Sequence, residues 1–231
     1  MGHLQVLIAD DSEFMRTAYK RILESESSMR VVAMASNGAE AVRSAAETAP
    51  DVAILDVRMP KVDGLQVAHE IRKHQPNTAI VVISAYDDLT YVANLMRNGV
   101  DRKAYLLKHS ISDIAALVRI VEAVHQGDTV IDSGIVRRMA ELFREHSAAL
   151  EIHLSPGEED LISLMAAGYD DGRICVTLHL DQMQMAKHSD SLYKKFGLTE
   201  GTFPELRTMA VKTFVGQLHK VPLSKTYDAV S

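Results

Sequence analysis

Short apolar runs of strand length recur through residues 1–126, and segments with helical spacing separate them. Each run is rich in Val, Ile and Leu, and such continuous apolar character is typical of strands covered on both faces. We therefore predict an α/β fold with a doubly wound, flavodoxin-like, five-stranded parallel sheet. The expected strands are Leu4–Ala9, Val31–Met34, Val52–Leu55, Ile80–Ile83 and Ala104–Leu107. In the last helical segment, Ile114, Leu117, Val118, Val121 and Val124 form one apolar stripe.

Beyond residue 126 the pattern is helical throughout. A helix is expected over Ile135–Arg144, and Ser155-Pro156-Gly157-Glu158 is a capping box that starts another. Asp181 with Gln184 and Thr202 with Glu205 mark two further helix starts, and a short turn over Leu178–Asp181 joins two helices. This arrangement predicts an all-α helix-turn-helix domain. The expected divisions are a first domain at 1–126, a helical linker at 127–153, the helix-turn-helix at 154–220 and a flexible tail at 221–231.

Composition restricts the class of protein. A chain of 231 residues with 47% hydrophobic and 24% charged residues fits two globular domains. The single cysteine excludes a disulfide framework, and no apolar stretch reaches the roughly 20 residues of a membrane span. Met1-Gly2-His3 shows no signal pattern, so we expect a cytoplasmic protein without membrane association. The net charge of −6 argues against a broadly basic nucleic-acid binder, although a local patch matters more than the total.

Polar residues stand where four of the predicted strands end. Asp10-Asp11 follow the first strand, Asp56 the third, Ser84 the fourth and Lys108 the fifth. The carboxyl ends of parallel strands share one edge, where such folds bind ligands. Carboxylates held close together repel one another unless a cation joins them, and oxygen ligands suit Mg²⁺. A carboxylate beside a hard cation, a hydroxyl and an ammonium group can accept a phosphoryl group.

Each of these residues also has an ordinary alternative role. Asp10, Asp11 or Ser12 could cap the following helix, and Asp56 could open a turn before Met59-Pro60. Lys108 could be a solvated surface lysine. Caps alone, however, do not account for five polar groups at the ends of four separate strands.

Residues 1–126 resemble the receiver domain of two-component response regulators. The resemblance implies that a histidine kinase phosphorylates Asp56 and that Ser84 and Lys108 bind the phosphoryl oxygens. It also implies Mg²⁺ coordination by Asp10, Asp11, Asp56 and the backbone carbonyl of Arg58, and a Tyr105 ring that turns inward. His109 departs from the proline that many receivers carry after the lysine. The matching positions are Asp10-Asp11, Asp56-Val57-Arg58-Met59-Pro60, Gly64, Ser84-Ala85 and Tyr105-Leu106-Leu107-Lys108.

Residues 154–220 resemble the LuxR-type helix-turn-helix of the NarL/FixJ subfamily of response regulators. The resemblance implies DNA binding by the helix that starts after Asp181, in a protein that dimerises when active. The candidate DNA contacts are Gln184, as a reader of a base edge, and the cations Lys187, Lys194 and Lys195. The matching positions are Leu154-Ser155-Pro156-Gly157-Glu158-Glu159, Gly168, Ile174, Leu178, Leu180, His188, Leu192, Phe196-Gly197-Leu198 and Ala210.

Departures from this family fall on the surface that should face DNA. Met183, Gln184 and Ala186 stand where family members usually carry lysine, threonine and lysine. Ser189 replaces a core valine, and Asp190 lies on or beside the DNA-facing side. Two hypotheses follow: a phosphorylation-controlled transcription regulator, or a response regulator whose output domain binds a protein instead. An enzymatic output is disfavoured, because the C-terminal half offers no nucleophile–base pair or phosphate loop; the receiver would assist only its own phosphorylation and dephosphorylation.

Overall fold

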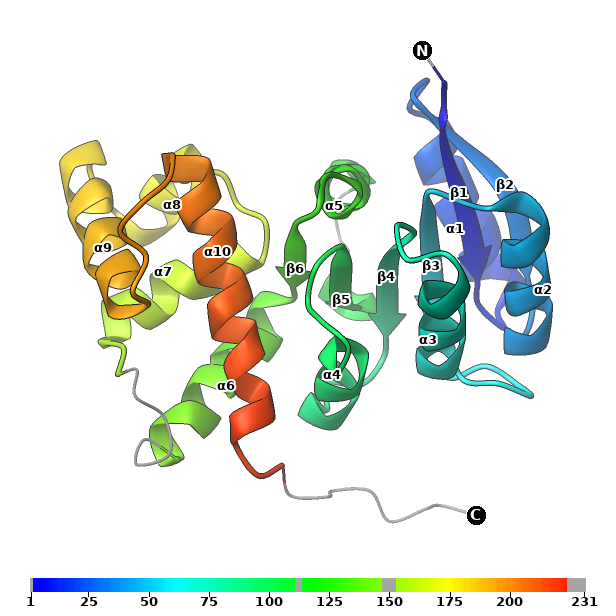
Figure 1. Cartoon of the computed structure of the whole chain (residues 1–231). Helices are drawn as coiled ribbons and strands as arrows, with labels where there is room; N and C mark the ends of the chain where they lie inside the picture. The colour runs from blue at the N-terminus through cyan, green and yellow to red at the C-terminus, as the bar shows by residue number, and fades with distance from the viewer. Residues whose placement is uncertain (1, 111–113, 147–152, 224–231) are drawn as a thin grey trace. The chain divides into compact units, whose positions relative to one another are not determined.

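The computed structural model describes residues 2–110, 114–146 and 153–223 (Figure 1). Backbone contacts divide the chain into two compact units. One comprises 1–87, 100–132 and 166–168, and the other comprises 88–99, 133–165 and 169–231. The first unit is α/β and the second is helical. The predicted α/β-plus-helical architecture is therefore confirmed.

A six-stranded parallel sheet in the order β2-β1-β3-β4-β5-β6 forms the centre of the α/β unit. The predicted parallel sheet is confirmed, but the predicted number of strands, five, is wrong because the sheet has six. The additional strand β6 lies in the segment expected to be a helical linker, and it pairs with β5 in the register Tyr105↔Ile131. The strands are β1 Leu4–Ala9, β2 Met29–Ala35, β3 Val52–Asp56, β4 Ala79–Ser84, β5 Lys103–Leu107 and β6 Thr129–Ile131.

Helices pack on the sheet through apolar stripes. In α5, Leu117, Val121 and Val124 are fully buried, as their spacing predicted. Side chains form the N-caps of the other three helices: Ser12 accepts the Met15 N–H, and Asn37 and Asp63 act in the same way. The helices of this unit are α1 Glu13–Glu24, α2 Gly38–Thr48, α3 Gly64–His74, α5 Ile114–Gln126 and the 3₁₀ helix η1 Lys108–Ser110.

The helical unit contains the predicted capping boxes. Asp181 accepts the Gln184 N–H at 2.7 Å, and the Thr202 N–H donates to Glu205 at 2.8 Å. The Phe143 and Phe214 rings pack edge to face 5.1 Å apart, which joins α6 to α10. The helices are α4 Leu89–Met96, α6 Ser133–Glu145, α7 Pro156–Ala166, α8 Asp171–Leu178, α9 Gln182–Lys195, α10 Phe203–Gly216 and η3 Gln217–Lys220.

The contacts group residues differently from the expected division at residue 126. Helix α4 packs against α6 and belongs to the helical unit, although the pattern assigned it to the first domain. Of the tail expected to be flexible, 221–223 is described and Val221 is buried, while 224–231 lies outside the described residues. The domain boundaries in the sequence stay a prediction.

A buried hydroxyl in α9 leads to a prediction about stability. Ser189 is fully buried, and in the described part of the chain its Oγ makes no hydrogen bond of good geometry, although it lies near the Tyr193 hydroxyl, which is buried and unsatisfied as well. We expect Ser189→Val to raise the free energy of unfolding by about 1–2 kcal/mol, because it removes an unsatisfied polar group. Thermal unfolding followed by circular dichroism measures the change.

Ser163 provides the matched control for this substitution. It is equally buried, but its Oγ donates to the Glu159 carbonyl at 2.6 Å. Ser163→Val should therefore give no gain in stability. A lower melting temperature for both Ser189→Val and the smaller Ser189→Ala would contradict the prediction.

Candidate functional site

The carboxyl edge of the sheet brings together the residues that end its central strands. Asp10 follows β1, Asp56 ends β3, and Lys108 follows β5. The Lys108 Nζ lies 2.9 Å from Asp10 Oδ2 and 3.1 Å from Asp56 Oδ1. Neither carboxylate is near Lys108 in the sequence. The three residues come together because the strands they end or follow lie parallel in one sheet.

The acidic cluster contains more negative charge than the lysine neutralises. One carboxylate oxygen from each of Asp10, Asp11 and Asp56 lies within 4.8 Å of the others. Asp10 and Asp56 are buried, whereas Asp11 is exposed and gives access from solvent. Oxygen atoms at this spacing fit a hard divalent cation with part of its water shell. The role of the Arg58 carbonyl in that coordination stays a prediction.

Burial and charge act against each other on the central pair. Burial raises the pKa of Asp56, and the hydrogen bond and charge of Lys108 offset this only in part. Burial lowers the pKa of Lys108, but its hydrogen bonds to Asp10 and Asp56 outweigh that effect and leave the pKa raised. Lys108 is therefore a charged, positioned donor, and the ionised Asp56 carboxylate favours additional positive charge nearby.

Backbone geometry fixes the position of Asp56. Helix α3 starts at Gly64, whose N–H donates to the Val57 carbonyl at 2.9 Å. A Cβ atom at Gly64 would lie 1.9 Å from the Asp56 carbonyl oxygen. Only glycine permits this approach between α3 and the end of β3.

Tyr86 connects several residues beside Asp56. Its N–H donates to Ser84 Oγ at 3.0 Å, and its carbonyl accepts the Tyr105 hydroxyl at 2.7 Å. The guanidinium carbon of Arg58 lies 4.1 Å from the centre of the Tyr86 ring, which is a cation–π contact. Tyr105 is fully buried, and its own carbonyl accepts the Asp132 N–H at the end of β6. The sequence pattern had not indicated the Arg58–Tyr86 contact or the link to β6.

The predicted DNA-binding residues have different surroundings on α9. Lys187 is exposed, and Lys194 is exposed with Asp190 3.9 Å away. Gln184 is exposed as well, but its Oε1 accepts the Asp181 N–H at 2.9 Å in the capping box. Its side-chain NH₂ remains as a donor, and a bidentate contact with adenine would have to compete with the cap.

Lys195 holds α7 and α9 together. Its Nζ lies 2.6 Å from Glu158 Oε2 and 2.9 Å from the His153 carbonyl oxygen. Glu158 is buried, and it also accepts the Ser191 hydroxyl and the Ser155 N–H. These bonds lower the pKa of Glu158 to about 2, against the raising effect of burial. The ammonium group of Lys195 is thus paired within the helical unit although its side chain is 38% exposed, and its role as a DNA contact stays a prediction.

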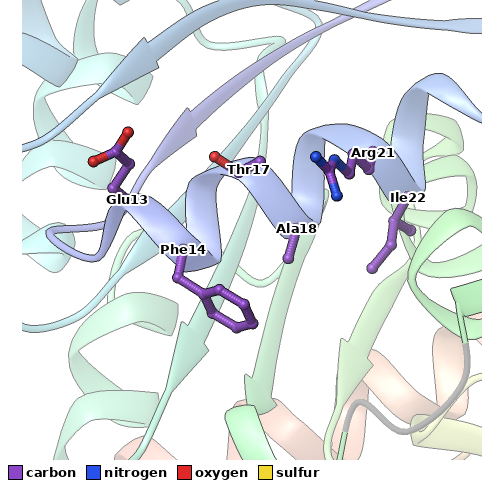
Figure 2. Close-up of a pocket in the computed structure, with 6 residues that line it drawn as sticks. All are labelled: Glu13, Phe14, Thr17, Ala18, Arg21 and Ile22. Carbon is purple, nitrogen blue, oxygen red and sulfur yellow. The ribbon is translucent and has the colours of Figure 1, made fainter.

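A surface pocket on α1 contains none of the residues of the acidic cluster and is partly apolar. Phe14, Ala18 and Ile22 point to the same side of the helix (Figure 2), and Glu13, Thr17 and Arg21 complete the lining. Phe14 is 78% exposed, which is unusual for a large apolar side chain. Its i, i+4, i+8 spacing with Ala18 and Ile22 could have been seen in the sequence. Only the structure shows that Phe14 is exposed, whereas Ala18 and Ile22 are half-buried and Ile22 packs against the core.

The fold and the carboxyl-edge site are those of a receiver-type domain. Residues 6–122 match the family model for the response regulator receiver domain. The chain is 31% identical over 218 residues to the oxygen regulatory protein NreC of Staphylococcus epidermidis, with 90% of this chain and 97% of that protein covered.

Two solved structures of response regulators are also similar to this chain. The signal receiver domain of the response regulator NarL from Mycobacterium tuberculosis is 32% identical with a TM-score of 0.50, and the match covers 55% of this chain and 98% of that one. A two-component response regulator of the LuxR family from Aurantimonas is 25% identical with a TM-score of 0.54, and the match covers 61% and 97%.

The chain belongs to the two-component response regulators of the NarL/FixJ type. The transcriptional regulatory protein DegU of Brevibacillus brevis is 28% identical over 217 residues, with 86% of this chain and 90% of that protein covered. DNA binding by the output domain is consistent with membership of the family. Among the described residues, no helix is long and apolar enough to cross a membrane.

Proposed function

We propose that a histidine kinase phosphorylates Asp56 and that this modification controls a DNA-binding output domain, active as a homodimer. The observation that carries the proposal is the position of the Lys108 ammonium, within 3.1 Å of Asp56 and 2.9 Å of Asp10 at the carboxyl edge of the sheet. Asp10, Asp11, Asp56 and the Arg58 carbonyl would hold Mg²⁺, which supplies charge neutralisation for phosphoryl transfer when bound.

The residues of the chain account for the transfer chemistry. A carboxylate oxygen of Asp56 attacks phosphorus, and the bond from phosphorus to the donor breaks with its electron pair leaving on the donor. Lys108 and the Ser84 hydroxyl stabilise the negative charge of the transferred oxygens. Attack by water on phosphorus later releases inorganic phosphate and restores the Asp56 carboxylate. The chain thus promotes only its own phosphorylation and dephosphorylation.

Contacts around Tyr105 support a route from this site toward the output domain. If Ser84 Oγ turns to a phosphoryl oxygen, it leaves the Tyr86 N–H, and Tyr86 is the residue that holds the Tyr105 hydroxyl. The Tyr105 carbonyl in turn binds the Asp132 N–H, directly before α6 begins at Ser133. Phosphorylation would shift the population between two arrangements of these hydrogen bonds.

The Tyr86 ring gives a prediction about the lifetime of the phosphorylated state. By family resemblance, Arg58 and Tyr86 flank the path of the attacking water, and in this chain they stack on each other. We expect Tyr86→Ala to shorten the phosphoryl half-life about fivefold, since opening the path lowers the barrier by about 1 kcal/mol. Release of phosphate from protein labelled with a small phosphodonor measures the half-life.

Tyr86→Phe is the matched control for this experiment. It keeps the ring over which Arg58 lies and keeps the backbone bonds to Ser84 and Tyr105, so its half-life should stay near that of the wild type. A half-life in Tyr86→Ala that is unchanged or longer would refute the shielding role.

The pocket on α1 fits a contact surface for the kinase. Helix α1 begins at Glu13, two residues after Asp11, so a partner that delivers a phosphoryl group to Asp56 has to approach this end of the helix. The exposed Phe14 ring, beside the half-buried Ala18 and Ile22, offers that partner apolar area (Figure 2).

Family membership and the exposed lysines of α9 support DNA as the target of the output domain. We assign Lys187 and Lys194 as phosphate contacts and Gln184 as a donor to a base edge. Asp190, 74% exposed by its side chain, should repel the DNA backbone. A second candidate, recognition of a protein partner, is supported by the modest charge of α9 and by Met183, which is 83% exposed.

A salt titration separates these two functions. Binding of the phosphorylated full-length protein to its own upstream DNA should weaken in Lys187→Ala, with the slope of log affinity against log salt reduced by about one unit. Asp190→Asn should strengthen binding without altering sequence preference. If both variants bind DNA as the wild type does, α9 does not enter the groove, and protein recognition becomes the better assignment.

A further inference from the structure

Helix α9 has an outward stripe with an unusual composition. Its members are spaced at i, i+4, i+7 and i+11, and they are Met183, Lys187, Asp190 and Lys194. All four are exposed, while the opposite face buries Met185, Ser189, Leu192 and Tyr193. Two cations thus line the later turns, and an apolar side chain occupies the first turn.

Met183 is more exposed than any other large apolar side chain that the structure describes. It is 83% exposed, and it follows Gln182, the first residue of α9. Methionine is among the residue types most often buried, so this exposure has no explanation in the packing of the domain. The capping box fixes the backbone of this turn, so the Met183 side chain leaves the helix in a defined direction.

The chemistry of the major groove identifies an apolar target for such a side chain. In helix-turn-helix proteins, the N-terminal residues of the second helix contact base edges. Among the groups that base pairs present in the major groove, the C5-methyl of thymine is the apolar one. The first turn of α9 carries no cation to bind the acceptor atoms of guanine, since its exposed residues are Gln182, Met183 and Gln184.

We propose that Met183 determines sequence specificity by contacting the C5-methyl group of a thymine in each half-site. The inference rests on the proposed DNA-binding function and adds a base preference to it. Gln184 is less suited to this role, because its Oε1 is held by the Asp181 N–H. Lys187 lies one helical turn beyond Met183 in the same stripe, where it reaches phosphate while Met183 reaches the base.

Replacing thymine by uracil removes the methyl group and leaves base pairing intact. Duplexes are first selected from a random library with the phosphorylated full-length protein, and each thymine of the selected site is then changed to uracil in turn. We expect one thymine per half-site at which uracil weakens wild-type binding about fourfold, the ratio that corresponds to burial of one methyl-sized group. Because the contact is uncharged, the ratio should be the same at low and high salt.

Variants of Met183 assign the effect to this residue. Met183→Ala should bind thymine and uracil duplexes equally at that position, and Met183→Leu should retain the preference for thymine. Met209→Ala is the control, since Met209 is an exposed methionine on α10 rather than α9, and it should keep the wild-type ratio.

The outcomes distinguish the inference from the function on which it rests. If the protein selects duplexes but uracil is tolerated at every position, or if Met183→Ala keeps the wild-type ratio, the role of Met183 is overturned while DNA binding stands. If no duplex is enriched from the library, DNA binding itself fails, and the inference fails with it.

Discussion

Asp56→Asn should abolish phosphorylation of the full-length protein by a small phosphodonor in the presence of Mg²⁺. An amide is neither a nucleophile nor a good ligand for a hard cation, so both contributions of Asp56 are lost together. Intact-mass measurement should show one added phosphoryl group on the wild type and none on the variant. The wild-type modification should be lost in acid and in base, as an acyl phosphate is, and removal of the divalent cation by a chelator should prevent it.

Asp160→Asn serves as the control, because Asp160 is an exposed carboxylate on α7 that takes no part in the acidic cluster. It should be phosphorylated as the wild type is. Asp11→Asn should keep the acceptor but lose a carboxylate of the cluster, so it should need more Mg²⁺ for the same rate. Equal phosphorylation of Asp56→Asn and the wild type would show that the acceptor lies elsewhere.

Lys195→Met should destabilise the helical unit by about 1–2 kcal/mol, less than for a fully buried pair because the Lys195 side chain is 38% exposed. The substitution leaves Glu158, whose side chain is only 4% exposed, without the cation that neutralises it. Lys194→Met is the matched control one residue away, because Lys194 is 74% exposed and lies 3.9 Å from Asp190. It should change the free energy of unfolding by less than about 0.5 kcal/mol. Chemical unfolding followed by circular dichroism gives both values.

The pH dependence gives a second test of the Glu158–Lys195 pair. The pKa of Glu158 is lowered to about 2 in the folded protein from 4.5, so the pair contributes fully above about pH 4.5. That contribution is lost as the pH falls toward 2. The stability of Lys195→Met should therefore approach that of the wild type across this window, and a constant difference between them would contradict the assignment.

Local signals determined the elements and much of the site. The apolar runs, the capping boxes at Asp181 and Thr202 and the α5 stripe depend on residues within a few positions of one another, so the sequence alone indicated them. The proximity of Asp10, Asp56 and Lys108 could be predicted from one general rule, that the carboxyl ends of parallel strands share an edge of the sheet.

Tertiary structure alone decided what depends on partners far apart in the chain. Thr129–Ile131 is too short to stand out as a strand, and it becomes β6 because the edge of β5 offers unpaired backbone groups. The sequence marks Lys195 as a candidate DNA contact on α9, and only the packing shows that Glu158, 37 positions earlier, binds its ammonium group. The Arg58–Tyr86 stack likewise joins two loops. A pattern of residue types records which side chains one element exposes, whereas the contacts between elements arise only when the chain packs.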